Sequence, residues 1–238
     1  MQRRNIETCF SPALFSTDDH RDDIVVIIDI LRASSAICTA FENGAREIIP
    51  VADIETARDY KSKGFLVAAE RDGYVLDFAD FGNSPFNFIP EKVRNKTIVY
   101  STTNGTGIIN KSSSSYMTVI ASFLNINAII KWLANRERNV LLFCAGWKNR
   151  FNLEDSICAG AIAEMLIKTG LYYSICDSTL ASLDLWSLAK ADPLKYIDKS
   201  AQRSRLRDKG LDDCIEFCLT KDFTAKVPVV KNGVLVAD

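Results

Sequence analysis

The run Ile24-Val25-Val26-Ile27-Ile28-Asp29-Ile30-Leu31-Arg32 decides the fold of this chain. Its first five residues are β-branched and apolar, which predicts a strand that is buried on both faces. Asp29 follows at the carboxyl end of this strand, and Arg32 comes three residues later. In open α/β sheets, ligands bind outside the carboxyl ends of the strands. We therefore expect a metal-binding carboxylate beside an anion-binding guanidinium at this point.

Strand and helix patterns alternate along the rest of the chain. Strands are expected over 47–51, 65–69, 97–101, 117–121 and 139–144, with helices over 34–43, 53–63, 122–135 and 153–169. The segment 227–236 reads as a β-hairpin that turns at Asn232-Gly233. This alternation predicts an α/β fold with a mostly parallel sheet covered on both faces. We expect a single domain over 1–238, which could subdivide into 1–110 and 111–238.

Composition excludes several classes of function. The net charge of −1 over 238 residues gives no electrostatic footprint for nucleic acid or an anionic membrane. No apolar run approaches the roughly 20 residues of a membrane helix, and no apolar signal core follows the N-terminus. Seven scattered cysteines suit a reducing compartment, so a cytoplasmic location is expected. The one histidine, His20, lies in a polar, loop-like stretch, so a catalytic histidine is not expected.

Chemically active side chains recur at the ends of four predicted strands. They are Asp29 with Arg32, Glu70 with Arg71, Thr102 to Thr106, and Cys144 to Gly146 followed by Arg150, Glu154 and Asp155. In a parallel sheet these loops open on one edge, so they would meet in one crevice. Carboxylates without histidine or cysteine partners suit Mg²⁺, while arginines and helix-start N–H groups suit phosphate, sulfonate or carboxylate. Phosphate-ester hydrolysis uses this combination of groups.

Other interpretations of the same residues stay open at this stage. An acid at a strand end or in a first helical turn can simply cap a helix or favour its dipole. The segment from Cys144 to Arg150 also fits C-x5-R, the phosphate loop of cysteine-dependent phosphatases, although Phe151 replaces the usual hydroxyl residue. A haloacid-dehalogenase site fails because Leu31 occupies the second Asp position, and no G-x-G-x-x-G follows the first strand.

Seven motifs, taken in order, resemble those of the 2-phosphosulfolactate phosphatase (ComB) family. They are Val26 to Ser35, Glu70-Arg71, Asp80 to Pro85, Thr102 to Thr106, Ala121 to Asn125, Cys144 to Gly146 and Glu154 to Gly160. The resemblance covers about residues 24 to 160 and implies a compact three-layer α/β/α fold. It also implies a Mg²⁺-dependent acid phosphatase that hydrolyses 2-phospho-3-sulfolactate to 3-sulfolactate and phosphate, a step of coenzyme M biosynthesis.

The resemblance leads to a set of expected roles. Asp29, Glu70, Asp80 and Asp155 are candidate Mg²⁺ ligands, and Asp29, Glu70 and Asp155 are also candidate catalytic groups. The candidates for binding substrate are Arg32, Arg71, Asn83, Ser84, Thr102, Thr103, Asn104, Gly105, Thr106 and Arg150. The expected partner is a small polyanion, with neither nucleic acid nor membrane, and a homodimer follows from base rates. The alternatives are a phosphatase for another small phosphorylated hydroxy-acid and a non-catalytic binder of such acids.

Overall fold

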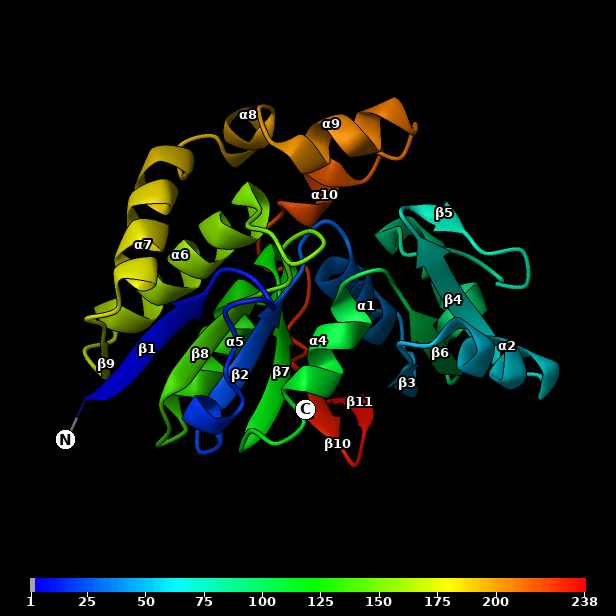
Figure 1. Ribbon diagram of the computed structural model, residues 1–238, viewed down its shortest axis with the longest axis horizontal. Coiled ribbons are helices and arrows are strands. Elements are labelled where there is room, and N and C mark those ends of the chain that lie inside the picture. The colour runs from blue at the N-terminus through cyan, green and yellow to red at the C-terminus, as the bar shows by residue number, and fades with distance from the viewer. Residues whose placement is uncertain (1–2) are drawn as a thin grey trace.

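One mixed sheet of eleven strands forms the centre of the computed structural model, which describes residues 3–238 (Figure 1). The strands are β1 (Arg4–Cys9), β2 (Ile24–Ile28), β3 (Glu47–Pro50), β4 (Leu66–Arg71), β5 (Tyr74–Val75), β6 (Thr97–Ser101), β7 (Met117–Ala121), β8 (Val140–Cys144), β9 (Tyr172–Tyr173), β10 (Pro228–Lys231) and β11 (Val234–Ala237). Their order across the sheet is β5-β4-β6-β3-β11-β10-β7-β2-β8-β1-β9. Strands from both halves of the chain interleave, since β2 lies between β7 and β8.

The sheet consists of two parallel blocks joined by a hairpin. One block contains β7, β2, β8, β1 and β9, and the other contains β3, β6 and β4. The β10–β11 hairpin pairs antiparallel with β7 through Val229 and with β3 through Leu235. Figure 1 shows the two blocks inclined to each other, with the carboxyl ends of β2 and β4 on the same side. The strand ends therefore converge, and the sheet is mostly parallel, as predicted.

Helices cover both faces of the sheet. The helices are α1 (Ala33–Glu42), α2 (Ile54–Ser62), α3 (Pro90–Val93), α4 (Gly105–Lys111), α5 (Ile126–Ala134), α6 (Leu153–Lys168), α7 (Asp177–Ala189), α8 (Pro193–Ile197), α9 (Ala201–Asp208) and α10 (Ile215–Cys218). Alternate residues of β2 point to opposite faces. Val26 and Ile28 pack with residues of α5, α6 and α7, whereas Val25 and Ile27 pack with residues of α1 and α4. The three-layer α/β/α fold is confirmed.

The local predictions agree well with the observed elements. Asp53 caps α2 by accepting the amide of Thr56, and the hairpin turns at Asn232 and Gly233, both at positive φ. The strand β1 was not predicted, because its sequence, Arg-Asn-Ile-Glu-Thr-Cys, shows little apolar alternation. No helix in the described part of the chain has the length and apolar character needed to cross a membrane.

The helices α8 and α9 cross the end of the sheet at which β2 and β4 finish (Figure 1). Helix α9 is connected to the body through polar contacts: Gln202 Nε2 donates to the carbonyl of Leu31 at 3.0 Å, and Lys209 Nζ, just after the helix, donates to the carbonyl of Asp72. The strand ends are thereby covered by a polar helix.

Candidate active site

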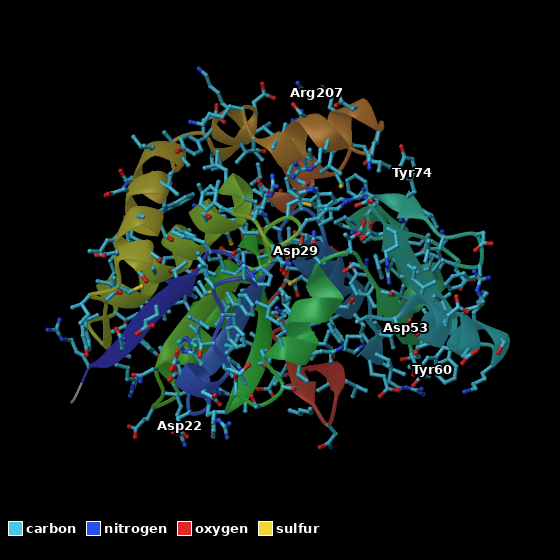
Figure 2. All side chains as sticks on the ribbon, in the orientation of Figure 1. Asp22, Asp29, Asp53, Tyr60, Tyr74 and Arg207 are labelled. Carbon is cyan, nitrogen blue, oxygen red and sulfur yellow. The ribbon has the colours of Figure 1, made fainter. Side chains whose placement is uncertain are left out.

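A pocket that is partly open to solvent lies between the strand ends and α9. The residues around it come from the loops after β2, β4, β6 and β8, and from α9. Its lining is Asp29, Leu31, Arg32, Glu70, Asp72, Gly73, Asn83, Thr102, Asn104, Trp147, Gln202, Arg205, Leu206 and Lys209. Figure 2 shows Asp29 near the middle of the molecule, where the ribbons of both sheet blocks approach each other. The predicted crevice therefore exists, and it contains both acids and cations.

The loop from Asp29 to Arg32 forms the floor of this pocket. It is held by the first turn of α1, since Ser34 N donates to the carbonyl of Asp29 at 2.7 Å and Ser35 Oγ donates to the carbonyl of Ile30 at 2.9 Å. The peptide bond between Leu31 and Arg32 is cis. The Arg32 side chain is only 4% exposed, and its Nε has no hydrogen-bond partner. A buried guanidinium with an unused donor fits the predicted role of an anion clamp.

Asp29 is the acid in the most unusual electrostatic environment of the pocket floor. Burial, together with the nearby charges of Glu70 and Glu154, raises the pKa of Asp29 to about 7, against the lowering effects of the Ala33 amide and the charge of Arg32. The Asp29 carboxylate accepts one long hydrogen bond from the Ala33 amide, at 3.4 Å. Asp29 therefore retains acceptor capacity for a cation or a proton, as expected of a functional acid.

Glu70 holds two loops together at the end of β4. One of its oxygens accepts the amide of Thr103 at 2.8 Å, and the other accepts the amide of Gly73 at 2.6 Å and the hydroxyl of Thr103 at 3.2 Å. The Thr103 hydroxyl oxygen in turn accepts the amide of Asp72. Glu70 thus fixes the loop after β6 to the turn after β4, and it contributes to the pocket wall.

The segment Thr102 to Thr106 is bound tightly into the opposite wall. Thr102 and Thr106 exchange backbone and hydroxyl hydrogen bonds, and both are buried. A Cβ on Gly105 would lie 3.2 Å from Asp29 Oδ2 and 2.8 Å from the Cβ of Ala33, so only glycine fits there. Hydroxyl groups of this segment are therefore largely used within the fold, while Thr102 and Asn104 line the pocket.

Of the predicted Asn83 and Ser84 pair, Asn83 lines the pocket. The Asn83 side chain is 8% exposed and its Oδ1 has no hydrogen-bond partner. Ser84 Oγ is also buried without a partner, but Ser84 is not part of the lining. The unused oxygen of Asn83 is available to a hydrogen-bond donor or a cation in the pocket.

Asp155 lies behind the pocket and organises the floor. Its oxygens accept the amide of Ile30 at 2.9 Å, the amide of Gly146 at 3.2 Å and the side-chain amide of Asn152 at 2.7 Å. Burial raises the pKa of Asp155 well above its usual range, and the charges of Asp29 and Glu154 act in the same direction. Because its oxygens accept three donors from the loops after β2 and β8, Asp155 acts here as a connection between the ends of these strands.

Three more of the predicted residues lie outside the pocket lining. Asp80 accepts the amide of Val67 and forms an ion pair of 2.5 Å with Lys61, beside the start of β4. Arg71 donates to the carbonyls of Glu70 and Ala52 and to Ser101 Oγ. Arg150 is exposed and closes a tight turn with Trp147 through paired backbone hydrogen bonds. All three are occupied or directed elsewhere.

The cysteine mechanism is not supported by the geometry. Cys144 is completely buried, and burial raises the pKa of its thiol well above the usual range. A phosphate loop needs the opposite, a thiol whose pKa is lowered by loop amides and an arginine. Arg150 is exposed and does not line the pocket, and His20 is bound to Asp23 at 2.9 Å and stacks on Phe15. Neither cysteine nor histidine chemistry is assembled at the pocket.

Several pocket residues were not predicted from the sequence. Trp147 follows the predicted Cys144 to Gly146 segment, and Gln202, Arg205 and Lys209 belong to the polar helix α9 and the residue after it. The guanidinium of Arg205 lies over the ring of Trp147 at 4.5 Å. A basic helix late in the chain is typical of a solvated surface, so only its long-range contacts identify it as part of the site.

The donor set fits Mg²⁺ in a limited way. Among residues 3–238 no group of three or more His, Cys, Asp or Glu side chains is arranged to hold a metal ion. Mg²⁺, however, is usually held by one or two carboxylates together with waters and substrate phosphate oxygens. Asp29 and Glu70 both line the pocket and could supply those carboxylates. Two of the four predicted Mg²⁺ ligands, Asp29 and Glu70, are therefore placed where they could bind the ion.

Fold and pocket together define an α/β protein with a strand-end site, in which buried acids and arginines line one pocket. Comparison with known proteins identifies the particular family. The model of the 2-phosphosulpholactate phosphatase family matches residues 9–233, and the chain belongs to this family of phosphatases. It is 39% identical over 211 residues to a probable 2-phosphosulfolactate phosphatase of Thermotoga maritima, covering 89% of this chain and 90% of that protein. A protein of the same name from Caldanaerobacter subterraneus subsp. tengcongensis is 35% identical over 221 residues, covering 91% of each chain.

Proposed function

We propose that this protein hydrolyses 2-phospho-3-sulfolactate to 3-sulfolactate and phosphate with the help of Mg²⁺, as a step of coenzyme M biosynthesis. The observation that carries the proposal is the pocket in which Asp29 and Arg32, both nearly buried, lie on one floor with Glu70 in the wall. The names of the family and of the relatives support the substrate.

The substrate carries a phosphate, a carboxylate and a sulfonate on a three-carbon skeleton. Arg32 is suited to bind the phosphate, because its unpartnered Nε and buried guanidinium offer charge-assisted hydrogen bonds in a site of low dielectric. Asn83 and Thr102 add polar contacts at the same wall. These residues would hold the ester with its phosphorus beside Asp29.

Asp29 and Glu70 are the residues that would hold Mg²⁺. When bound, the ion supplies positive charge to the transferring phosphoryl group and orients the attacking water. In the reaction, the oxygen of water attacks phosphorus and the P–O bond to the hydroxy-acid breaks. A carboxylate of the pocket would accept one proton of the water and return it to the leaving oxygen, which becomes the hydroxyl of 3-sulfolactate.

The test is a phosphate-release assay with 2-phospho-3-sulfolactate, 2-phospholactate and 2-phosphoglycerate, with Mg²⁺ or with EDTA. We expect 2-phospho-3-sulfolactate to have the highest kcat/KM and EDTA to abolish turnover. Asp29→Asn should lower kcat/KM by roughly 100-fold or more, since a charge-stabilising group ordinarily contributes several kcal/mol and each decade is about 1.36 kcal/mol.

Asp22→Asn is the matched control, because Asp22 is exposed and lies far from Asp29 (Figure 2). It should leave kcat/KM unchanged. Full activity in EDTA would contradict the metal requirement. A preference for 2-phosphoglycerate or 2-phospholactate would identify the other hydroxy-acid phosphatase, and binding without turnover would identify a non-catalytic binder.

A further inference from the structure

Arg205 places an incompletely used guanidinium in the pocket. Its Nε donates to Gln202 Oε1 at 2.9 Å, and its guanidinium lies over the ring of Trp147 at 4.5 Å. Its two terminal nitrogens make no hydrogen bond to any of the residues 3–238. The side chain is held in place from one edge and one face, while the other edge of the guanidinium fork is free to bind an anion bidentately.

Gln202 couples this arginine to the floor of the pocket. Its Nε2 donates to the carbonyl of Leu31 at 3.0 Å, while its Oε1 accepts from Arg205. One amide therefore bridges α9 and the loop that contains Asp29 and Arg32. Because its orientation is fixed before a ligand arrives, Arg205 loses little conformational freedom when it binds one.

The pocket thus holds two arginines at different depths. Arg32 is 4% exposed and belongs to the floor beside Asp29, whereas Arg205 is half-buried and comes from the covering helix. The phosphate must lie at the floor, because the acids that serve hydrolysis are there. The outer arginine is left for a second anionic group of the same ligand.

We propose, on the basis of the proposed function, that Arg205 binds the sulfonate of 2-phospho-3-sulfolactate and makes the pocket specific for it. The sulfonate oxygens lie one bond farther from the phosphorylated carbon than the carboxylate oxygens, so the sulfonate reaches outward to the covering helix. The methylene that carries the sulfonate can pack against the indole of Trp147, which already supports the guanidinium. A guanidinium is weakly hydrated, so pairing it with a weakly basic, three-oxygen anion costs little desolvation.

The experiment compares two substrates that differ only in this group. 2-Phospholactate has the skeleton of 2-phospho-3-sulfolactate with a hydrogen in place of the sulfonate. Arg205→Met should lower kcat/KM for 2-phospho-3-sulfolactate by roughly 100-fold, which is about 2.7 kcal/mol at about 1.36 kcal/mol per decade, and leave kcat/KM for 2-phospholactate within about 3-fold. Arg205→Lys keeps the charge but loses the fork, so an intermediate loss is expected.

Arg207→Met is the matched control on the same helix. Arg207 is half-exposed and donates to Asp198, on the outer side of α9 (Figure 2). It should change kcat/KM for neither substrate. Equal losses on both substrates in Arg205→Met, or no loss on either, would overturn the assignment of the sulfonate to Arg205.

Calorimetric titration with 3-sulfolactate and with lactate separates this inference from the proposed function. We expect Arg205→Met to weaken the binding of 3-sulfolactate and to leave the weak binding of lactate unaltered. A wild type that releases no phosphate but loses 3-sulfolactate affinity in Arg205→Met contradicts the phosphatase proposal and supports the sulfonate site. Unchanged affinity for 3-sulfolactate in Arg205→Met overturns the sulfonate site whatever the turnover.

Discussion

The substitution Gly105→Ala tests how closely the pocket wall is fitted to Asp29. A Cβ at residue 105 would lie 2.8 Å from the Cβ of Ala33 and 3.2 Å from both Asp29 Oδ2 and Thr102 Oγ1. The closest contact is with a Cβ that is attached directly to the backbone of α1. The clash can therefore be relieved only by moving α4 away from α1 or by displacing Asp29 and Thr102.

The expected cost follows from two opposing effects. Overpacking of a well-packed site costs about 1–3 kcal/mol, while replacing glycine by alanine in a helix gains up to about 1 kcal/mol. We expect the free energy of unfolding to fall by about 1–2 kcal/mol, which for a chain of this size lowers Tm by roughly 2–8 °C. A displacement of Asp29 by about 1 Å should reduce kcat/KM by roughly 100-fold.

Gly107→Ala supplies the control within the same helix, since a Cβ there meets no atom within 4 Å. It should raise the free energy of unfolding by about 0.5–1 kcal/mol and leave kcat/KM unchanged. Urea unfolding followed by circular dichroism gives the stabilities, and phosphate release gives kcat/KM. If the two alanine variants were equally stable and equally active, the described fit of Gly105 between α1, Asp29 and Thr102 would be refuted.

Three further outcomes are expected. In EDTA, the free energy of unfolding should fall as pH rises from about 4 to about 7. Burial raises the pKa of Asp29 to about 7 in the folded protein, so over this range the native state binds a proton that the unfolded state has released. Asp29→Asn should flatten this pH dependence, measured by urea titration at each pH, and an unchanged slope would argue against the burial of the Asp29 charge. Cys144→Ala should change kcat/KM by no more than about 2-fold, and the small cavity that it leaves should lower the free energy of unfolding by about 1–2 kcal/mol. Loss of turnover in this variant would instead support the cysteine mechanism. Gly160→Ala should destabilise the protein by about 3 kcal/mol or more, because the new Cβ would lie 2.0 Å from the carbonyl oxygen of Ser182, where α6 packs against α7. The measurements are the yield of soluble folded protein and the Tm, both of which should fall. A normal Tm would mean that the two helices separate easily.

The sequence predicts the frame of the site better than the direction of its side chains. The apolar run before Asp29 places that acid at a strand end, and the structure confirms both the strand and the pocket. Glu70 and Arg71 were expected to face the same ligand. They are neighbours in β4, however, so their side chains must point to opposite faces, and only Glu70 faces the pocket. Strict alternation along the strand was a signal that could have separated them.

Arg150 and Arg205 show a second limit of sequence-based prediction. Arg150 lies close in sequence to the end of β8, yet Lys148 and Asn149 adopt positive φ in a turn that directs it to solvent. Arg205 is far in sequence from every strand end, yet it contacts Trp147 and lines the pocket. Local spacing carries no information on how a late helix folds back over the sheet, so the contribution of α9 appears only in three dimensions.

The acids at the strand ends divide into two groups once their hydrogen bonds are counted. Glu70 and Asp155 each accept donors from two separate loops, and these contacts hold the ends of β4, β6, β2 and β8 in register around the pocket. Asp29 accepts only one long contact from the amide of Ala33, although it is only 9% exposed. Burying a carboxylate costs free energy unless its oxygens accept hydrogen bonds. A buried acid at the floor of a pocket whose oxygens lack donors is therefore best explained by a ligand that supplies the missing contacts. The chain therefore uses Asp155 to build the pocket and Asp29 to act within it, while Glu70, which joins two loops and also lines the pocket, serves both uses.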